Sequence, residues 1–143
     1  MINYALRPAT QADLELLDRI HTENMKGYVE QLYSWNSNLF IDNFIAAQYQ
    51  VIEVDCVIAG FLKVVVSQSD IYLGEIQIAA RDRSKGIGSS IISNLIRRAR
   101  QDDRRLWLKV IKNNPAVELY RRLGFTVFAT SRTHLMLEIK PQP

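Results

Sequence analysis

Hydrophobic side chains recur at helical spacing in three stretches of the chain. The first stretch, residues 11–26, follows Thr10 and an aspartate three residues later, a pair that resembles a capping box. The second begins directly after Gly86 and carries its apolar residues on one face, with Ser, Asn and Arg at the facing positions. The third is short, because the Asn114–Pro115 pair suits a helix start and Gly124 suits a helix end. The pattern therefore predicts a helix in each of these stretches.

Strand-forming residues occupy most of the remaining chain. The predicted strands are residues 4–7, 49–54, 57–67, 71–79, 106–111, 126–129 and 134–139. Breaks at Asp55-Cys56 and at 67–70 make the three middle strands an antiparallel meander. Residues 27–44 mix aromatic and polar side chains without a clean period, and we expect a second helix and a loop there. The resulting order, β, two α, three β, α, β, α, two β, predicts a single α/β domain over residues 1–143 with a mixed sheet.

Composition narrows the class of protein. The 143 residues, 48% hydrophobic and 23% charged, have the size and makeup of one globular domain. The N-terminus lacks the pattern of a secretory signal, and no apolar run approaches the roughly 20 residues that span a bilayer, so we expect a cytoplasmic protein without a membrane segment. Cys56 is the sole cysteine and His21 lies far from His134, so we expect neither a disulfide nor a metal site.

The basic excess of the chain is modest. A net charge of +3 is small for a nucleic-acid-binding protein, and a bound polyanionic cofactor would account for it as well. The arginine-rich stretch 97–105 is interrupted by Asp102 and Asp103, which favours a solvated surface. We therefore expect no nucleic-acid partner.

The segment 83–88, Arg-Ser-Lys-Gly-Ile-Gly, lies between the end of a predicted strand and the start of a predicted helix. Backbone N–H groups at a helix N-terminus stabilise an anion, and glycines let the backbone approach a diphosphate closely. A Walker loop is excluded, because Gly88 is followed by two serines instead of Lys and Ser or Thr. A dinucleotide fingerprint is weak, because the third glycine is missing and the turn follows a meander.

Several motifs around this turn occur together in one order. The turn Arg83-x-x-Gly-x-Gly follows the strand 73–79, and Asn113-x-x-Ala-x-x-Leu-Tyr and Arg122-Leu-Gly-Phe lie downstream. Together they resemble the GNAT acetyltransferase superfamily over nearly the whole chain. The resemblance implies a GNAT-like mixed, largely antiparallel central sheet flanked by about four helices. It also implies acetyl-CoA (coenzyme A) as the cosubstrate.

The reaction that the resemblance implies is transfer of an acetyl group to a primary amine of a small molecule or of a protein or peptide, by direct attack in a ternary complex. The alternative is a non-catalytic acyl-CoA-binding sensor of the same fold. Many members of the superfamily are homodimers, although no interface can be identified from this sequence. The sequence does not name the acceptor or the preferred acyl chain.

The resemblance also implies residues for the cosubstrate. Main chain at Ile76, Ile78 and Ala80 would pair with the pantetheine arm, as an added strand would. Amides of the turn would hold the pyrophosphate, at Arg83, Ser84, Lys85, Gly86, Ile87, Gly88 and Ser89. Further contacts would come from Asn113, with Asn114 as an alternative, and from Ala116 and Tyr120 on the following helix. Tyr120 would also protonate the departing thiolate, and the alternative is a core tyrosine with a satisfied hydroxyl.

A proton acceptor is also required, because an alkyl ammonium with a pKa of about 10.4 must lose a proton before it attacks. Glu75 and Gln77 stand on one face of a predicted central strand, where polar side chains are costly unless paired or used. Glu75 is therefore the candidate general base, directly or through water, and the alternative is a structural ion pair. An acceptor wall is expected from Tyr28, Glu30, Tyr33 and Trp35, which could instead fill the core beneath a helix.

Overall fold

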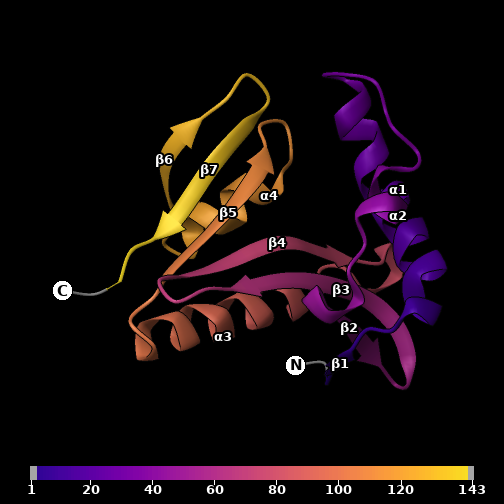
Figure 1. Ribbon diagram of the computed structural model, residues 1–143, viewed down its shortest axis with the longest axis horizontal. Helices are drawn as coiled ribbons and strands as arrows, with labels where there is room; N and C mark the ends of the chain where they lie inside the picture. Colours follow the sequence, from indigo (N-terminus) through magenta and orange to yellow (C-terminus); the bar gives the residue numbers. More distant parts are fainter. Residues whose placement is uncertain (1–2, 142–143) are drawn as a thin grey trace. The chain divides into compact units, whose positions relative to one another are not determined.

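The computed structural model describes residues 3–141. The helices are α1 (Leu14–Glu30), α2 (Leu39–Asn43), α3 (Ile87–Gln101) and α4 (Ala116–Arg122), with short 3₁₀ turns at Gln11–Asp13, Ala46–Gln48 and Ala80–Asp82. The strands are β1 (Ala5–Pro8), β2 (Tyr49–Val54), β3 (Val57–Val66), β4 (Asp70–Ile78), β5 (Arg105–Ile111), β6 (Thr126–Thr130) and β7 (His134–Ile139) (Figure 1).

The described strands hydrogen-bond in the order β1-β2-β3-β4-β5-β7-β6. The pairs β1–β2, β2–β3, β5–β7 and β6–β7 are antiparallel, whereas β4 and β5 are parallel. The sheet is therefore mixed and largely antiparallel, with four α-helices in the described chain. Both the predicted fold class and the predicted order of elements are confirmed.

The structure differs from the sequence prediction between residues 11 and 44. The first helix begins with a 3₁₀ turn and continues past residue 26, through Gly27, to Glu30. A methyl group at Gly27 would meet no atom within 4 Å, so the glycine marks no tight packing there. The second helix is correspondingly short, because residues 27–30 belong to α1 and α2 spans only Leu39–Asn43.

The described chain forms two compact units. Unit 1 contains the residues up to Lys63 together with Glu75–Ile87, and unit 2 contains Val64–Gly74 and the residues from Gly88 onward. In the described residues no helix is both long and apolar enough to cross a bilayer.

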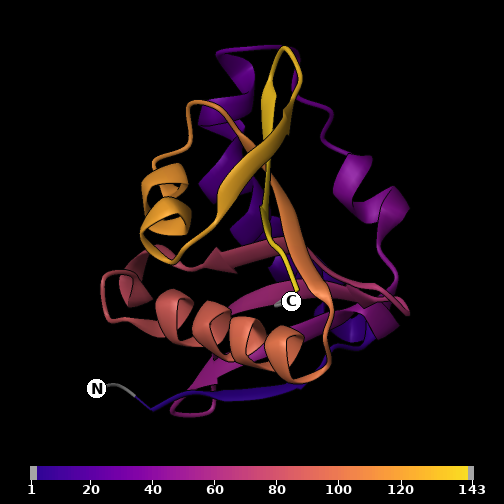
Figure 2. The same cartoon turned by 90° about the vertical axis from the view of Figure 1, so that its left-hand side faces the viewer.

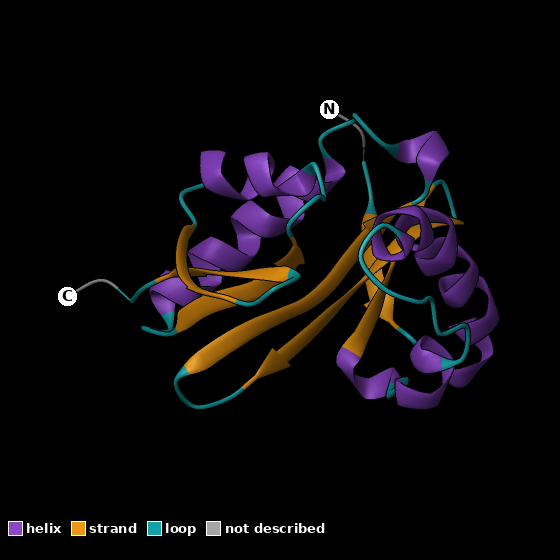
Figure 3. Cartoon of the chain, turned by 90° about the horizontal axis from the view of Figure 1, so that it is seen from above, coloured by secondary structure: helices purple, strands orange, loops and turns teal. Residues whose placement is uncertain are grey.

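Unit 1 has a core in which helices α1 and α2 pack on β2 and β3. The buried core residues are Ala9, Leu17, Ile20, Phe40, Tyr49, Val51, Phe61 and Ala79. Figure 3 distinguishes the helices (purple) from the strands (orange) along the described chain. Asp55 and Cys56 both have positive φ, 51° and 64°, as in the two-residue hairpin turns whose twist matches the flanking strands. The predicted break between β2 and β3 is therefore confirmed.

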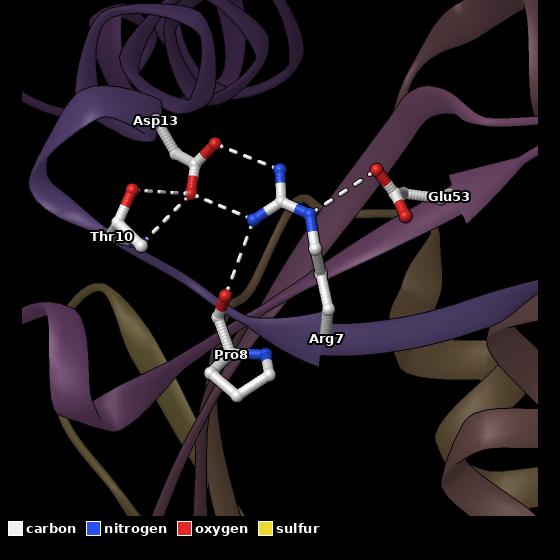
Figure 4. A network of polar contacts seen from close by, with 5 residues as sticks. All are labelled: Arg7, Pro8, Thr10, Asp13 and Glu53. Carbon is white, nitrogen blue, oxygen red and sulfur yellow. Dashed lines mark hydrogen bonds and ion pairs between the residues drawn. The ribbon is translucent and has the colours of Figure 1, made fainter.

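An ion-pair network fixes the start of α1 to the strands of unit 1 (Figure 4). Arg7 of β1 pairs with Asp13 at 2.9 Å and with Glu53 of β2 at 3.2 Å. The backbone N–H of Thr10 donates to the Asp13 carboxylate at 2.8 Å, as the predicted capping box requires. The Arg7 guanidinium lowers the pKa of Asp13 from 3.8 to about 2. The carboxylate is thus ionised in the folded state at all but strongly acidic pH.

Unit 2 contains α3, α4 and the hairpin of β6 and β7, which Figure 2 shows in yellow. The buried residues of α3 in this unit are Ile91, Ile92, Leu95, Ile96 and Ala99, which share the predicted apolar face. The side-chain oxygen of Asn114 accepts a hydrogen bond from the Ala116 N–H at 2.9 Å, and α4 is followed by Gly124 at φ 102°. The residues predicted to start and to end α4 therefore both have these roles in the structure.

Candidate active site

The polar residues predicted on β4 face helix α1 within unit 1. Glu75 and Gln77 are two positions apart on the strand, so their side chains share one face. His21 and Asn24 are three positions apart on α1 and share a face of the helix. His21 Nδ1 contacts Glu75 Oε1, with side-chain exposures of 20% and 16%. A carboxylate and an imidazole are therefore paired at a half-buried position.

A chain of hydrogen bonds continues from this pair. Gln77 Nε2 donates to Glu75 Oε1 at 3.2 Å, and Asn24 Nδ2 donates to Gln77 Oε1 at 3.1 Å. Asn24 Nδ2 also reaches the Ile78 carbonyl at 3.0 Å, and its side-chain oxygen accepts from the Arg83 guanidinium. We call these five side chains, His21, Glu75, Gln77, Asn24 and Arg83, the α1–β4 polar chain. Each internal bond fixes the orientation of the next group.

Aromatic rings enclose the other side of His21. The imidazole stacks on Phe40 with a centroid separation of 4.7 Å and an interplanar angle of 23°. Trp35 lies 5.5 Å from it, centroid to centroid. Phe40 is buried and also contacts Tyr49 and Phe61 in the core of unit 1. The imidazole is therefore held in one orientation by a rigid apolar base and a carboxylate.

The predicted anion-binding turn is exposed and has unusual backbone geometry. Ser84 and Gly86 have positive φ, 62° and 84°, and α3 begins immediately afterwards at Ile87. Among residues 3–141, the backbone N–H groups of Ser84, Lys85 and Gly86 have no hydrogen-bond partner. Successive N–H groups in such conformations form a concave site that suits an anion, and the positive end of a helix dipole adds to it. The turn therefore fits a phosphate group.

The basic side chains of this turn contact protein groups. Lys85 pairs with the buried Asp82 at 3.4 Å. Arg83 Nε donates to the Ile78 carbonyl at 3.2 Å, in addition to its contact with Asn24. The guanidinium thus links the turn to the α1–β4 polar chain.

Strand β4 has a partly unpaired edge. Its ladder with β5 runs from Asp70–Arg105 to Leu73–Leu108, so residues 75–78 lie beyond it in the described chain. On the opposite edge the strand order places β3, and the Ala79 N–H donates to the Ala59 carbonyl at 2.7 Å. An extended ligand with amide groups can add to such an edge. Ile76 and Ile78, predicted to contact pantetheine, lie in this stretch, and the exposed Ala80 begins the next turn.

The remaining predicted cosubstrate residues belong to unit 2. Gly88 and Ser89 lie in the first turn of α3. Tyr120 is 8% exposed on α4, and its ring meets Phe125 edge-on at 5.7 Å. Asn113 is half-buried just before α4, whereas Asn114 uses its side chain to cap that helix.

The four predicted acceptor residues are dispersed in unit 1. Trp35 is the one with a ring contact to His21. Tyr28 is half-buried near the end of α1, and Glu30 is the exposed last residue of that helix. Tyr33 is 43% exposed in the loop that follows. The structure therefore brings Trp35 into ring contact with the polar chain.

Sequence reasoning missed His21 and Asn24 as site residues. His21 falls on the apolar stripe of the predicted helix and so resembles a core residue. The available signal was the spacing of His21 and Asn24 on one helix face, matched by Glu75 and Gln77 on one strand face. No pattern in the sequence joins positions 54 residues apart, and only the packing of α1 on β4 does so. In the described residues no three His, Cys, Asp or Glu side chains gather as a metal site would require.

Comparison with known proteins identifies the class. The sequence model of the acetyltransferase (GNAT) family matches residues 13–125, so the chain belongs to this family. Acetyl-CoA is the usual cosubstrate of its members. No curated protein matches the chain.

Solved structures share the fold at low sequence identity. PaiA N-acetyltransferase from Thermoplasma acidophilum, in complex with coenzyme A, has a TM-score of 0.76 and 17% identity, over 97% of this chain and 99% of that chain. Arabidopsis thaliana Naa50, in complex with the bisubstrate analogue CoA-Ac-MVNAL, has a TM-score of 0.72 and 15% identity, over 97% and 99%. The ribosomal-protein-S18-alanine N-acetyltransferase from Escherichia coli has a TM-score of 0.72 and 18% identity, over 96% and 93%.

Proposed function

We propose that the chain is an N-acetyltransferase that moves the acetyl group of acetyl-CoA to a primary amine by direct attack in a ternary complex. The observation that carries the proposal is the position of two features on one continuous segment of unit 1. Residues 75–78 supply a half-buried carboxylate and an open strand edge, and residues 84–86 supply backbone amides that suit a phosphate. An acetyltransferase would use both features. The carboxylate and the open strand edge would serve the reacting groups, and the amides would hold the phosphates of the cosubstrate.

The cosubstrate would lie along this segment. The amides of 84–86, with those of Ile87, Gly88 and Ser89 at the start of α3, would hold the pyrophosphate. The main chain at Ile76, Ile78 and Ala80 would pair with the amides of the pantetheine arm. Asn113 and Ala116 are proposed as further contacts on the basis of the motif that they match.

The reaction requires a proton acceptor, an oxyanion donor and a proton donor. Glu75 belongs to the proton-accepting centre, because a half-buried carboxylate held by Gln77 is oriented for one geometry. A backbone N–H of β4 would stabilise the oxyanion. Tyr120 would protonate the departing thiolate, a role proposed from its position in the motif.

The acceptor is proposed to be a primary amine of a small molecule or of a protein or peptide. Two proteins of similar fold act on, or were captured with, peptide or protein amines, namely Naa50 with its peptide-bearing analogue and the S18-alanine enzyme. The exposed loop after α1, with Tyr28, Glu30, Tyr33 and Trp35 in or near it, is the proposed acceptor side of the site.

We further propose that the chain acts as one domain in the cytoplasm. The family match runs without interruption from residue 13 to residue 125 and so includes parts of both compact units. This continuity supports one functional domain.

The test is calorimetric titration with acetyl-CoA, followed in the same preparation by thiol release against a panel of small amines and N-terminal peptides. We expect micromolar binding and acceptor-dependent thiol release. Binding without release by any acceptor would favour an acyl-CoA sensor, and absence of binding would refute the role of the 84–86 turn.

A further inference from the structure

We propose that His21 is the group that takes the proton from the attacking amine, and that Glu75 positions it. This inference rests on the proposed acetyl transfer and deepens it, because it names the atom that touches the acceptor. It also replaces direct proton abstraction by the Glu75 carboxylate.

The contacts of the imidazole leave one nitrogen available. Nδ1 is bound to the Glu75 carboxylate, whereas Nε2 has no hydrogen-bond partner among residues 3–141. The side chain is 20% exposed, so small molecules can reach it. Phe40 and Trp35 cover the ring and hold its plane. A fixed ring with one free nitrogen has the geometry of a general base.

The carboxylate determines which nitrogen is basic. An ionised carboxylate only accepts hydrogen bonds, so the neutral imidazole must carry its proton on Nδ1 and present the lone pair at Nε2. Glu75 accepts the hydrogen bond from Nδ1, so Nε2 is the atom of this pair that can take a proton from the acceptor. Glu75 is the titratable group that contacts the ring, and the other elements packed on it contribute Phe40 and Trp35.

The rest of the α1–β4 polar chain serves this pair. Gln77 donates to the same oxygen, Glu75 Oε1, that binds His21, and Asn24 fixes the Gln77 amide. The carboxylate therefore keeps one orientation toward the imidazole. A single ion pair would be enough to hold α1 against β4. The additional oriented amides of Gln77 and Asn24 therefore support a positioning role for Glu75.

The proton and electron pairs balance in one addition and one elimination. The nitrogen lone pair of the neutral amine forms the C–N bond to the thioester carbonyl carbon, the C=O π pair moves onto the oxygen, and the amine proton passes to His21 Nε2. The oxygen pair then re-forms the C=O bond, the C–S bond breaks, and the thiolate leaves with the bonding pair and takes a proton from Tyr120. The imidazolium, stabilised by Glu75, returns its proton to solvent, and Tyr120 regains from solvent the proton that it gave to the thiolate.

The first experiment compares His21→Asn, whose amide can still donate to Glu75, with Glu23→Gln, an exposed control on the same helix. We expect His21→Asn to lose 100-fold or more in kcat/KM, as loss of a general base does, while acetyl-CoA affinity and Tm are retained. The control should keep wild-type kcat/KM. Added imidazole should restore part of the activity of His21→Ala in a saturable manner. Wild-type activity in His21→Asn would overturn the proposal.

The second experiment distinguishes the two candidate bases with Glu75→Gln. If His21 is the base, the rising limb of kcat/KM against pH remains, although kcat falls because the carboxylate that orients the imidazole is gone. If Glu75 itself were the base, that limb would vanish and imidazole would rescue nothing. Every variant is assayed with the same amine acceptor, so the ionisation of that amine affects all of the pH profiles equally. This profile also decides the question should the His21 variants fail to fold.

Failure of the inference and failure of the proposed function give different results. A wild-type protein that binds acetyl-CoA and acetylates an amine, with His21→Asn equally active, overturns the role of His21 alone. A wild-type protein that neither binds acetyl-CoA nor releases thiol overturns the proposed function, and with it the present inference.

Discussion

A methyl group at Gly60 of β3 would collide with the strand that carries Glu75 and Gln77. A Cβ at this position would lie 2.1 Å from the backbone oxygen of Gln77 and 3.1 Å from the Cα of Ile78. Since Cβ atoms essentially never approach other atoms within 3.0 Å, one of the two strands must move by roughly 1 Å. Backbone cannot rotate aside as a side chain would. We expect Gly60→Ala to reduce the free energy of unfolding by about 2–3 kcal/mol, the upper range for overpacking.

The effect should extend to activity. A displacement of about 1 Å at a catalytic group can cost about 100-fold in rate, and β4 bears one half of the His21–Glu75 pair. We therefore expect a lower kcat together with the loss of stability. A matched control is Gly27→Ala in α1, where a Cβ meets nothing within 4 Å. That change should raise stability by about 0.5–1 kcal/mol, because alanine loses less backbone entropy in a helix.

The assay is urea unfolding followed by fluorescence and circular dichroism, with kcat/KM measured on the same samples. Coincident transitions would justify a two-state free energy. Wild-type stability in Gly60→Ala would refute the reasoning, because it would mean that the close approach of β3 and β4 is relieved without cost. Destabilisation by Gly27→Ala would refute the account of the control.

Further substitutions test other parts of the structure. The lowered pKa of Asp13 contributes stability that is present above its ordinary pKa of 3.8 and is lost as pH falls toward about 2. Asp13→Asn should therefore lower the free energy of unfolding by about 2 kcal/mol near pH 7, from about 1.36 kcal/mol per pKa unit, and by progressively less below pH 4. Equal losses in urea titrations at both pH values would contradict this. Tyr120→Phe should lower kcat about 10-fold or more with little change in acetyl-CoA affinity by calorimetry, and native turnover would exclude the tyrosine as the acid. Gly86→Val should abolish the binding of acetyl-CoA measured by calorimetry, because a β-branched residue is strained at φ 84°. The control Gly124→Ala, at φ 102° outside the turn, should lower Tm and leave the affinity for acetyl-CoA intact.

Local patterns predicted much of the fold. The start of the helix after Gly86 and the bounds of the strands 49–54 and 134–139 were predicted as observed, because each segment has a clean period. The segment 27–44 was predicted less well, since its aromatic residues obscure the period and Gly27 lies inside a helix. Element boundaries there depend on packing against the core, which local sequence does not encode.

The candidate site was predictable only in the parts that are contiguous in sequence. Glu75 and Gln77 stood out as polar residues on a mainly apolar strand, and the 83–88 turn stood out for its glycines. His21 did not, because its neighbours on the helix face are apolar and its partner lies 54 residues away. A side chain whose role comes from a long-range contact has no local signature.

The α1–β4 polar chain has a consequence for the kinetic order of the reaction. Its last member, Arg83, belongs to the anion-binding turn, and its first member is His21. A phosphate at the turn would compete with Asn24 for the guanidinium, and Asn24 in turn holds the amide that orients Glu75. Occupation of the turn by one substrate would thereby alter the centre that receives the other. An enzyme whose two substrate sites are coupled in this way should bind its substrates in a fixed order, with the thioester bound before the amine.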